Sequence, residues 1–277
     1  MSLRHVRRTP VHNGPAAWSE ILGLAPVRSS LKGDAGCDIA IVGAGFAGLS
    51  AARRLREIAP QAKLVIVDAG QVAEGGAGRN SGFMIDLPHD LTSHDYASGE
   101  GRDRALTRLN RHAIDWAEAA VRGYGIPEGY FQRSGKINGA ASGVGLRANA
   151  SYAAHLGSLK EPHELLDAKA MREITGTGYY QGGLFTPGTA MLQPAGYIRG
   201  FADGLERDGV TIFEKSPVLR FESTGPGWRL QFATGTLSAA KVILANNGHL
   251  ESFGFRQGQL MHIMLNACMT QELSETQ

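Results

Sequence analysis

The stretch DIAIVGAGFAGLSAARRL, residues 38–55, constrains the fold more than any other part of the chain. Its apolar start predicts a strand over residues 38–42, and the spacing of apolar residues after the glycines predicts a helix from about Phe46 to Ile58. A second apolar run, KLVIVD, predicts a strand over residues 63–68. A strand, a helix and a strand in this order form a crossover, which implies parallel strands and a right-handed connection.

Three glycines fill the turn between the first strand and the helix. Gly43, Gly45 and Gly48 form the pattern G-x-G-x-x-G, and Asp68 ends the second strand 20 residues after Gly48. In a dinucleotide-binding crossover, the first glycine permits the tight turn, the second lets the main chain approach a pyrophosphate, and the third lets the helix pack closely on the strand. Amides and the helix dipole hold the phosphates, and the acid accepts hydrogen bonds from a ribose. The alternative is a tight turn beside a solvated aspartate.

The motif leaves the type of dinucleotide open. GAGFAG contains no lysine, unlike the GKS or GKT of a P-loop, so we expect no ATP or GTP hydrolysis at this turn. The crossover alone does not separate NAD from FAD. A second glycine-rich segment, EGGAGRNSG (residues 74–82), either supplies further amides to an extended cofactor or forms a solvent-exposed loop.

The rest of the chain alternates helical and strand patterns. We expect a long helix over residues 106–123 with Leu109 on its apolar face, an irregular strand pair over 130–142, a helix that begins at Pro194, and a small meander of strands over 211–245. These elements, with the crossover, predict an α/β protein.

Composition excludes several classes of protein. A length of 277 residues suggests about two domains, and a formal net charge of +2 argues against a nucleic-acid footprint. No apolar run reaches the length of a membrane span. The two cysteines, Cys37 and Cys268, form no CxxC spacing, so we expect reduced thiols, no metal site and a cytoplasmic location.

Several segments together resemble the FAD-dependent amino-acid and amine oxidases of the D-amino-acid oxidase superfamily, above all the γ-glutamylputrescine oxidase and glycine oxidase branches. These segments follow the family's order from about Cys37 to Gly248. They read CDIAIVGAGFAGLSAARRL, VIVDAG, GGAGRNSGF, GLFTPGTAMLQPAGYIRGFADGLERDGVTIFEKSPVLRF and KVILANNGH.

The resemblance implies a Rossmann-type FAD-binding domain with an incomplete α+β substrate domain. The implied FAD-binding parts are residues 37–125 and 194–250, and the implied substrate-domain parts are residues 126–193 and 251–277. Similar proteins continue well past this point, so the resemblance implies either a C-terminally truncated product or a second chain that completes the fold.

The resemblance also implies FAD as the cofactor and a set of residues around it. Asp68 would bind the adenosine ribose, and Val218 would meet the adenine through its main chain. Arg79 is alternatively a surface cation, Asn80 a turn residue and Val218 a buried strand residue. The implied cofactor-binding residues are Gly43, Ala44, Gly45, Phe46, Ala47, Gly48, Asp68, Ala69, Gly76, Ala77, Gly78, Arg79, Asn80, Gly82, Val218, Ala245 and Asn246.

In similar enzymes a hydride leaves the carbon beside a neutral amine and reaches the flavin, O2 reoxidises the flavin, and the imine hydrolyses. This route requires no acid–base pair from the protein, so no catalytic residue is assigned. The implied substrate is a small amine or amino acid. Two alternatives stay open: an NAD-dependent dehydrogenase that uses the same glycines, and an inactive cofactor-binding remnant or partner subunit.

Overall fold

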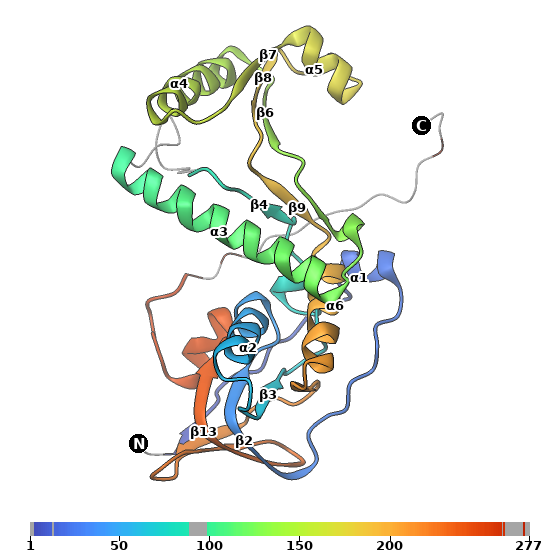
Figure 1. Cartoon of the computed structure of the whole chain (residues 1–277), viewed down its shortest axis with the longest axis vertical. Helices are drawn as coiled ribbons and strands as arrows, with labels where there is room; N and C mark the ends of the chain where they lie inside the picture. The colour runs from blue at the N-terminus through green and yellow to red at the C-terminus, as the bar shows by residue number, and fades with distance from the viewer. Residues whose placement is uncertain (1–2, 13, 89–98, 262, 264–273, 275–277) are drawn as a thin grey trace. The chain divides into compact units, whose positions relative to one another are not determined.

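The computed structural model describes residues 3–12, 14–88, 99–261, 263 and 274. The chain divides into two compact units (Figure 1). The first unit is Met1–Asn80 with Pro194–Gln277, and the second is Ser81–Gln193. Both units combine helices and strands, which confirms the α/β prediction.

The first unit is built on a seven-stranded sheet with the order β1-β11-β12-β13-β2-β3-β10. Its strands are β1 (Arg4–His5), β2 (Gly33–Val42), β3 (Leu64–Val67), β10 (Thr211–Phe213), β11 (Arg220–Ser223), β12 (Trp228–Gln231) and β13 (Gly235–Leu244). Its helices are α1 (Ala17–Leu22), α2 (Phe46–Ile58) and α6 (Pro194–Arg207), with the 3-10 helices η1 (Gly76–Gly78) and η3 (Asn247–Phe253). The long strands β2 and β13 lie side by side in Figure 1.

The centre of this sheet is parallel, as the crossover predicts. β2 pairs in parallel with β3, and helix α2 between them spans the predicted residues. The prediction of a meander over 211–245 is only partly right. β11, β12 and β13 do run antiparallel in order, but β10 pairs in parallel with β3, and β13 pairs in parallel with β2. Local strand patterns do not encode these long-range pairings, so the sequence pattern missed them.

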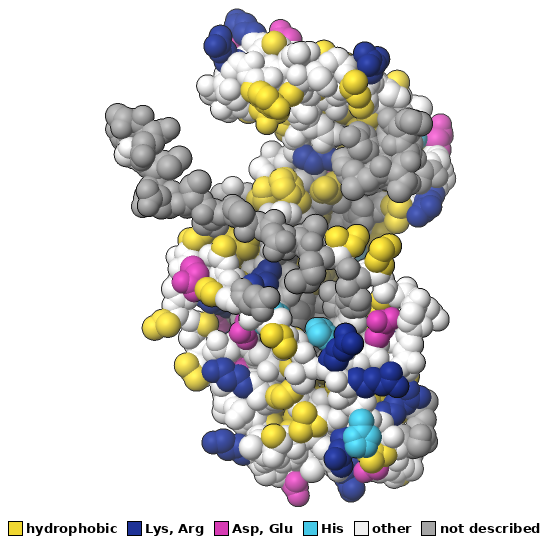
Figure 2. Space-filling view, turned by 180° about the vertical axis from the view of Figure 1, so that it is seen from behind, with side chains coloured by type: hydrophobic (Ala, Val, Ile, Leu, Met, Phe, Trp, Pro, Cys, Tyr) yellow, Lys and Arg dark blue, Asp and Glu magenta, His cyan; other side chains and the backbone are white. Residues whose placement is uncertain are grey.

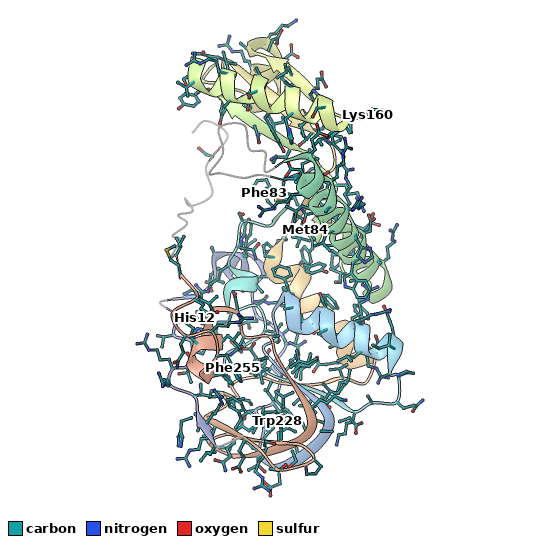
Figure 3. All side chains as sticks on the ribbon, turned by 90° about the vertical axis from the view of Figure 1, so that its left-hand side faces the viewer. His12, Phe83, Met84, Lys160, Trp228 and Phe255 are labelled. Atoms are coloured by element: carbon teal, nitrogen blue, oxygen red, sulfur yellow. The ribbon has the colours of Figure 1, made fainter. Side chains whose placement is uncertain are left out.

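Strand β3 is buried along its whole length, as expected of a parallel strand covered on both faces. Alternate side chains of β2 and β3 join one core cluster on one face of the sheet. Phe221 of β11 contacts the rings of Trp228 and Phe255 in this cluster, with centroids 6.1 and 6.2 Å away. Figure 3 shows both labelled side chains in this unit. The cluster therefore anchors the antiparallel strands to the parallel centre.

The second unit holds two three-stranded sheets, with the orders β4-β9-β5 and β6-β8-β7. Figure 3 labels Phe83 and Met84, which form β4. The strands are β4 (Phe83–Met84), β5 (Phe131–Gln132), β6 (Lys136–Ala140), β7 (Glu164–Asp167), β8 (Gly182–Thr186) and β9 (Ala190–Leu192). The helices are α3 (Glu100–Tyr124), α4 (Gly143–Leu159), α5 (Ala168–Thr175) and the 3-10 helix η2 (Glu128–Tyr130).

Two expectations for the second unit are corrected. β5 and β6 do not pair with each other, because β5 pairs with β9 and β6 pairs with β8. Leu109 is 63% exposed, and α3 instead buries Ile114, Ala117 and Ala120. Helix α4 was not predicted, because its small residues and scattered glycines carry little periodic signal; the Ser142 hydroxyl caps it by accepting from the amide of Gly145 at 3.4 Å.

The division of the chain falls between Asn80 and Ser81, whereas the predicted FAD-binding segment extends to residue 125. Helix α3 therefore groups with the second unit. Of the predicted second substrate-domain segment, residues 251–277, the described residues 251–253 belong to η3 and residues 254–261 form no strand, while most of residues 262–277 lie outside the described residues. Which unit binds cofactor and which binds substrate stays a prediction.

Candidate dinucleotide-binding site

The first glycine turn joins β2 to α2, and two of its glycines are sterically required. Gly43 has a φ of +111°, and a Cβ there would lie 2.6 Å from the carbonyl oxygen of Ala245. A Cβ at Gly48 would overlap the carbonyl oxygen of Gly43 and crowd Ile41. The structure thus confirms a tight turn at Gly43 and close packing at Gly48.

Gly45 lies in a different environment. A Cβ there would meet only Ala77, at 3.5 Å, which is an ordinary contact. No packing within the described residues therefore demands glycine at this position. The space beside Gly45 suits a ligand that approaches the main chain at the N-terminus of α2, where the first N–H groups have no partner within the helix.

This turn lies at the reversal point of the parallel sheet. From β2 the chain passes through α2 to β3 on one side, while β13 pairs with β2 on the other side. The amide of Ala245, just after β13, donates to the carbonyl of Val42 at 2.8 Å. In open α/β sheets, ligands bind in the crevice at the carboxyl ends of the strands where the strand order reverses.

Asp68 faces the glycine turn. Its Oδ2 accepts a hydrogen bond from the amide of Ala44 at 2.8 Å, and its Oδ1 accepts one from the amide of Gly70 at 2.9 Å. A carboxylate offers about four acceptor positions, so these two bonds leave capacity for a ligand hydroxyl. The carboxylate therefore stabilises the turn and keeps acceptor positions for a ligand hydroxyl.

The second glycine loop adjoins the first turn, because Ala77 is the neighbour of Gly45. A Cβ at Gly78 would overlap the main chain of Ala73, whereas a Cβ at Gly75 or Gly76 would meet nothing within 4 Å. Within residues 74–80 of this loop, packing thus requires glycine at position 78 alone. Gly75 and Gly76 therefore have open space on the side where a Cβ would lie.

The side chains of Arg79 and Asn80 build this loop. Arg79 Nε donates to the carbonyl of Glu74 at 2.6 Å, so Arg79 is no unpartnered surface cation. Asn80 Nδ2 donates to the carbonyls of Gly76 and Ala77 at 3.3 and 2.8 Å, which matches the alternative of a turn residue. Any contact of these two residues with a cofactor stays a prediction.

Asn246 is the residue whose chemistry most points to a ligand. It follows β13 next to the first glycine turn, and both polar atoms of its carboxamide are buried without a hydrogen-bond partner among the described residues. An unsatisfied buried amide is costly, so a polar group bound beside Asn246 would stabilise this arrangement. The site therefore fits a ligand with hydroxyl or phosphate groups.

Comparison with known proteins identifies the family. The model of the family "FAD dependent oxidoreductase" (DAO) matches residues 38–274 of the chain. The chain belongs to this family. FAD is accordingly its cofactor, which favours the FAD interpretation of the glycine turn over the NAD one.

Curated relatives share this family. The chain is 25% identical to the probable oxidoreductase OrdL of Haemophilus influenzae over 77% of this chain and 49% of the relative. It is 27% identical to the gamma-glutamylputrescine oxidoreductase of Escherichia coli over 77% of this chain and 50% of the relative. The chain thus spans about half the length of these relatives.

Solved structures share the fold. Glycine oxidase from Geobacillus kaustophilus superposes with a TM-score of 0.67 and 19% identity, over 79% of this chain and 58% of that one. L-Amino acid deaminase from Proteus myxofaciens gives a TM-score of 0.64 and 16% identity, over 87% and 51%. These likenesses confirm the expected fold class.

Within this flavoprotein fold, the structure gathers most predicted site residues in the first unit. Ala69 follows Asp68, and Phe46 lies at the start of α2 with its ring centroid 6.2 Å from that of Tyr197 in α6. The Val218 side chain belongs to the core cluster, so it is buried as the alternative predicts, but it lies between β10 and β11 rather than in a strand. Gly82 lies in the second unit, where a Cβ would overlap the carbonyl oxygen of Leu192.

The sequence pattern missed the segment that follows β10. The amide of Lys215 donates to the carbonyl of Gly70 at 2.9 Å, and the amide of Ser216 donates to that of Asp68 at 2.7 Å. These bonds fix the acid-bearing end of β3 from a segment far along the chain. The residues after β10 show no sequence pattern that predicts these two hydrogen bonds.

The Cys37 thiol of β2 is protonated at neutral pH, because burial raises its pKa to about 11. The described residues contain no cluster of three or more metal-ligating side chains and no helix long and apolar enough to cross a membrane. On the face in Figure 2, Lys and Arg side chains are dispersed among other types rather than gathered in a stripe.

Proposed function

We propose that this chain is the FAD-binding part of an oxidoreductase that oxidises a C–N bond of an amine or amino acid, with O2 as the electron acceptor. The observation that carries the proposal is the group of residues at the carboxyl ends of β2, β3 and β13, which combines the glycine turn, Asp68 and the unsatisfied carboxamide of Asn246. The names of the relatives, among them gamma-glutamylputrescine oxidoreductase and glycine oxidase, support the class of substrate.

Each group of residues at this site would hold a different part of FAD. The amides at the start of α2 would bind the pyrophosphate beside Gly45, and Asp68 would accept from the adenosine ribose. The Asn246 carboxamide, with one donor and one acceptor side, would bond to polar groups of the cofactor. The main chain of Ala77 and Gly78 would line the opposite side. The remaining predicted cofactor residues keep the roles that the resemblance implies.

Bound FAD supplies the two-electron oxidation, so this chain contributes binding, orientation and exclusion of water. No catalytic residue is assigned. The first unit is proposed as the FAD-binding part and the second as part of the substrate domain. The whole activity, the small-molecule substrate, a second chain that completes the fold, and a cytoplasmic location are all parts of this proposal. An inactive cofactor-binding remnant or partner subunit is the second candidate.

Gly45→Val tests the site. A Cβ at Gly45 would meet only Ala77, at 3.5 Å, so we expect the variant to fold while its side chain fills the approach to the pyrophosphate. Flavin absorbance after incubation with FAD and gel filtration should appear for the unchanged chain and disappear for the variant. Gly101→Val, in α3, has no neighbour within 4 Å and serves as the matched control. Unchanged flavin binding by a folded Gly45→Val protein would reject the assigned site.

Activity needs a separate measurement. Peroxide release from a panel of primary amines and amino acids, with the FAD-loaded chain, should identify the substrate class. FAD binding without peroxide from any substrate would favour the remnant or subunit. Tight NADH binding with no flavin binding would contradict the proposal.

A further inference from the structure

The polar lead-in before β2, residues 14–32, forms hydrogen bonds with the second glycine loop. Arg79 Nη2 donates to the carbonyl of Gly14 at 2.7 Å, while its Nε donates within the loop to the carbonyl of Glu74. Trp18 Nε1 donates to the carbonyl of Asn80 at 2.8 Å. One end of the loop is therefore tied to residues 14–18 through two side chains, one from each partner.

The lead-in is itself fixed to the first unit. Ala16 is only 3% exposed, and α1 follows it directly. Arg199 of α6 donates to the carbonyl of Gly23 at 3.1 Å. The segment thus rests on α6 and is not a free extension.

The other end of the loop is reached through Arg28. This buried guanidinium bonds to Asp203 and Glu206 of α6 and, at 3.3 Å, to Glu214 after β10. Glu214 Oε1 also accepts from the amide of Val72 at 2.9 Å, two residues before the loop. The three carboxylates raise the pKa of Arg28, against the opposing effect of burial.

We propose that residues 14–32, which we call the lead-in strap, hold the second glycine loop in the conformation that receives the dinucleotide. Trp18, Arg28 and Arg79 act as positioning residues, because their side chains bond to the main chain of the loop or to a group that does. The inference rests on the proposed function and adds to it a segment that lies before the motif.

The physical reason is the entropy of an irregular loop. A Cβ at Gly75 or Gly76 would meet nothing within 4 Å, and Ala73 holds a positive φ of 69°, a conformation that L-residues other than glycine rarely adopt. A loop ordered only on binding loses part of the binding free energy to ordering. A strap that orders the loop beforehand removes that loss from the affinity for the cofactor.

Trp18→Phe is the first test, since phenylalanine keeps a ring but removes the indole donor. We expect faster hydrogen exchange of main-chain amides in residues 72–80 without cofactor, a roughly fivefold weaker FAD affinity and a melting temperature lowered by at most a few degrees. Trp228→Phe, in the sheet of the same unit, is the matched control and should change neither the amide exchange of the loop nor the affinity for FAD. Arg79→Lys, which keeps the charge but loses the forked donors, should reproduce the effect if Trp18→Phe fails to fold.

A reciprocal measurement separates the two proposals. If the strap and the cofactor both stabilise one loop conformation, FAD should slow exchange in residues 14–24, although they need not contact it. Unchanged loop exchange in both variants without cofactor would overturn the strap. Faster loop exchange in the variants, together with no flavin binding by the unchanged chain, would support the strap and overturn the proposed function.

Discussion

The two glycine segments of the first unit reach a defined shape by different means. In the first turn, main-chain overlap selects glycine at positions 43 and 48, and Asp68 adds a single side-chain brace. In the part of the second loop that lies in the first unit, residues 74–80, only Gly78 is selected by overlap, and the shape depends on side chains from other segments. A short motif predicts a turn whose contacts lie mostly within one crossover. It does not predict a loop whose shape depends on distant partners.

Gly48→Ala should produce the largest loss of stability. Its Cβ would overlap the Gly43 carbonyl, so helix α2 must shift against β2, and we expect the free energy of unfolding to fall by about 4 kcal/mol. Urea denaturation measures this. Gly101→Ala, at an open helical position, should instead be neutral or stabilising by up to about 1 kcal/mol. A loss below about 1 kcal/mol for Gly48→Ala would break the claim that overlap determines the first turn.

Arg28→Met should come next and tests the second loop. It leaves Glu214, whose side chain is 2% exposed, without its cation, so we expect a loss of about 3 kcal/mol. Arg54→Met removes an exposed ion pair with Glu57 and should change stability by less than about 0.5 kcal/mol. Equal effects of the two substitutions, measured by the same denaturation, would contradict a role for the buried ion cluster.

Asn80→Ala should have the smallest effect. It removes two hydrogen bonds from Nδ2 to the loop carbonyls of Gly76 and Ala77, and we expect a loss of about 1 kcal/mol. Thr236→Val removes an exposed side-chain hydrogen bond to Asp34 and should stay within about 0.5 kcal/mol. An Asn80→Ala protein as stable as this control would show that the loop needs no side-chain support from Asn80.

The sequence predicted well wherever the contacts are local. The bounds of α2 and the tight turn at Gly43 both follow from motif and periodicity. It failed where partners lie far apart along the chain, as for the parallel pairing of β10 with β3 and the separate sheets of β5 and β6. Hydrogen-bond partners of a strand depend on chain topology, which short patterns do not carry.

The candidate site shows the same division. Spacing alone indicated the glycine turn and Asp68, and the resemblance added Asn246 without any role for its side chain. Nothing in the polar lead-in marked Trp18 or Arg28, because a single tryptophan and a single arginine have no period and no motif. Their partners become visible only when α6, β10 and the loop are in place.

The amino-acid sequence by itself determined the crossover, the glycine turn after β2, and the family of FAD-dependent oxidoreductases. The backbone preference of one residue and apolar periodicity act over a few neighbours, so a short stretch of sequence is enough to specify them. Only the tertiary structure decided which strands flank β2, that Asn246 is buried unsatisfied beside the turn, and that the lead-in holds the second loop. Burial and long-range hydrogen bonds depend on the packing of the whole unit, and no short stretch of sequence specifies that packing.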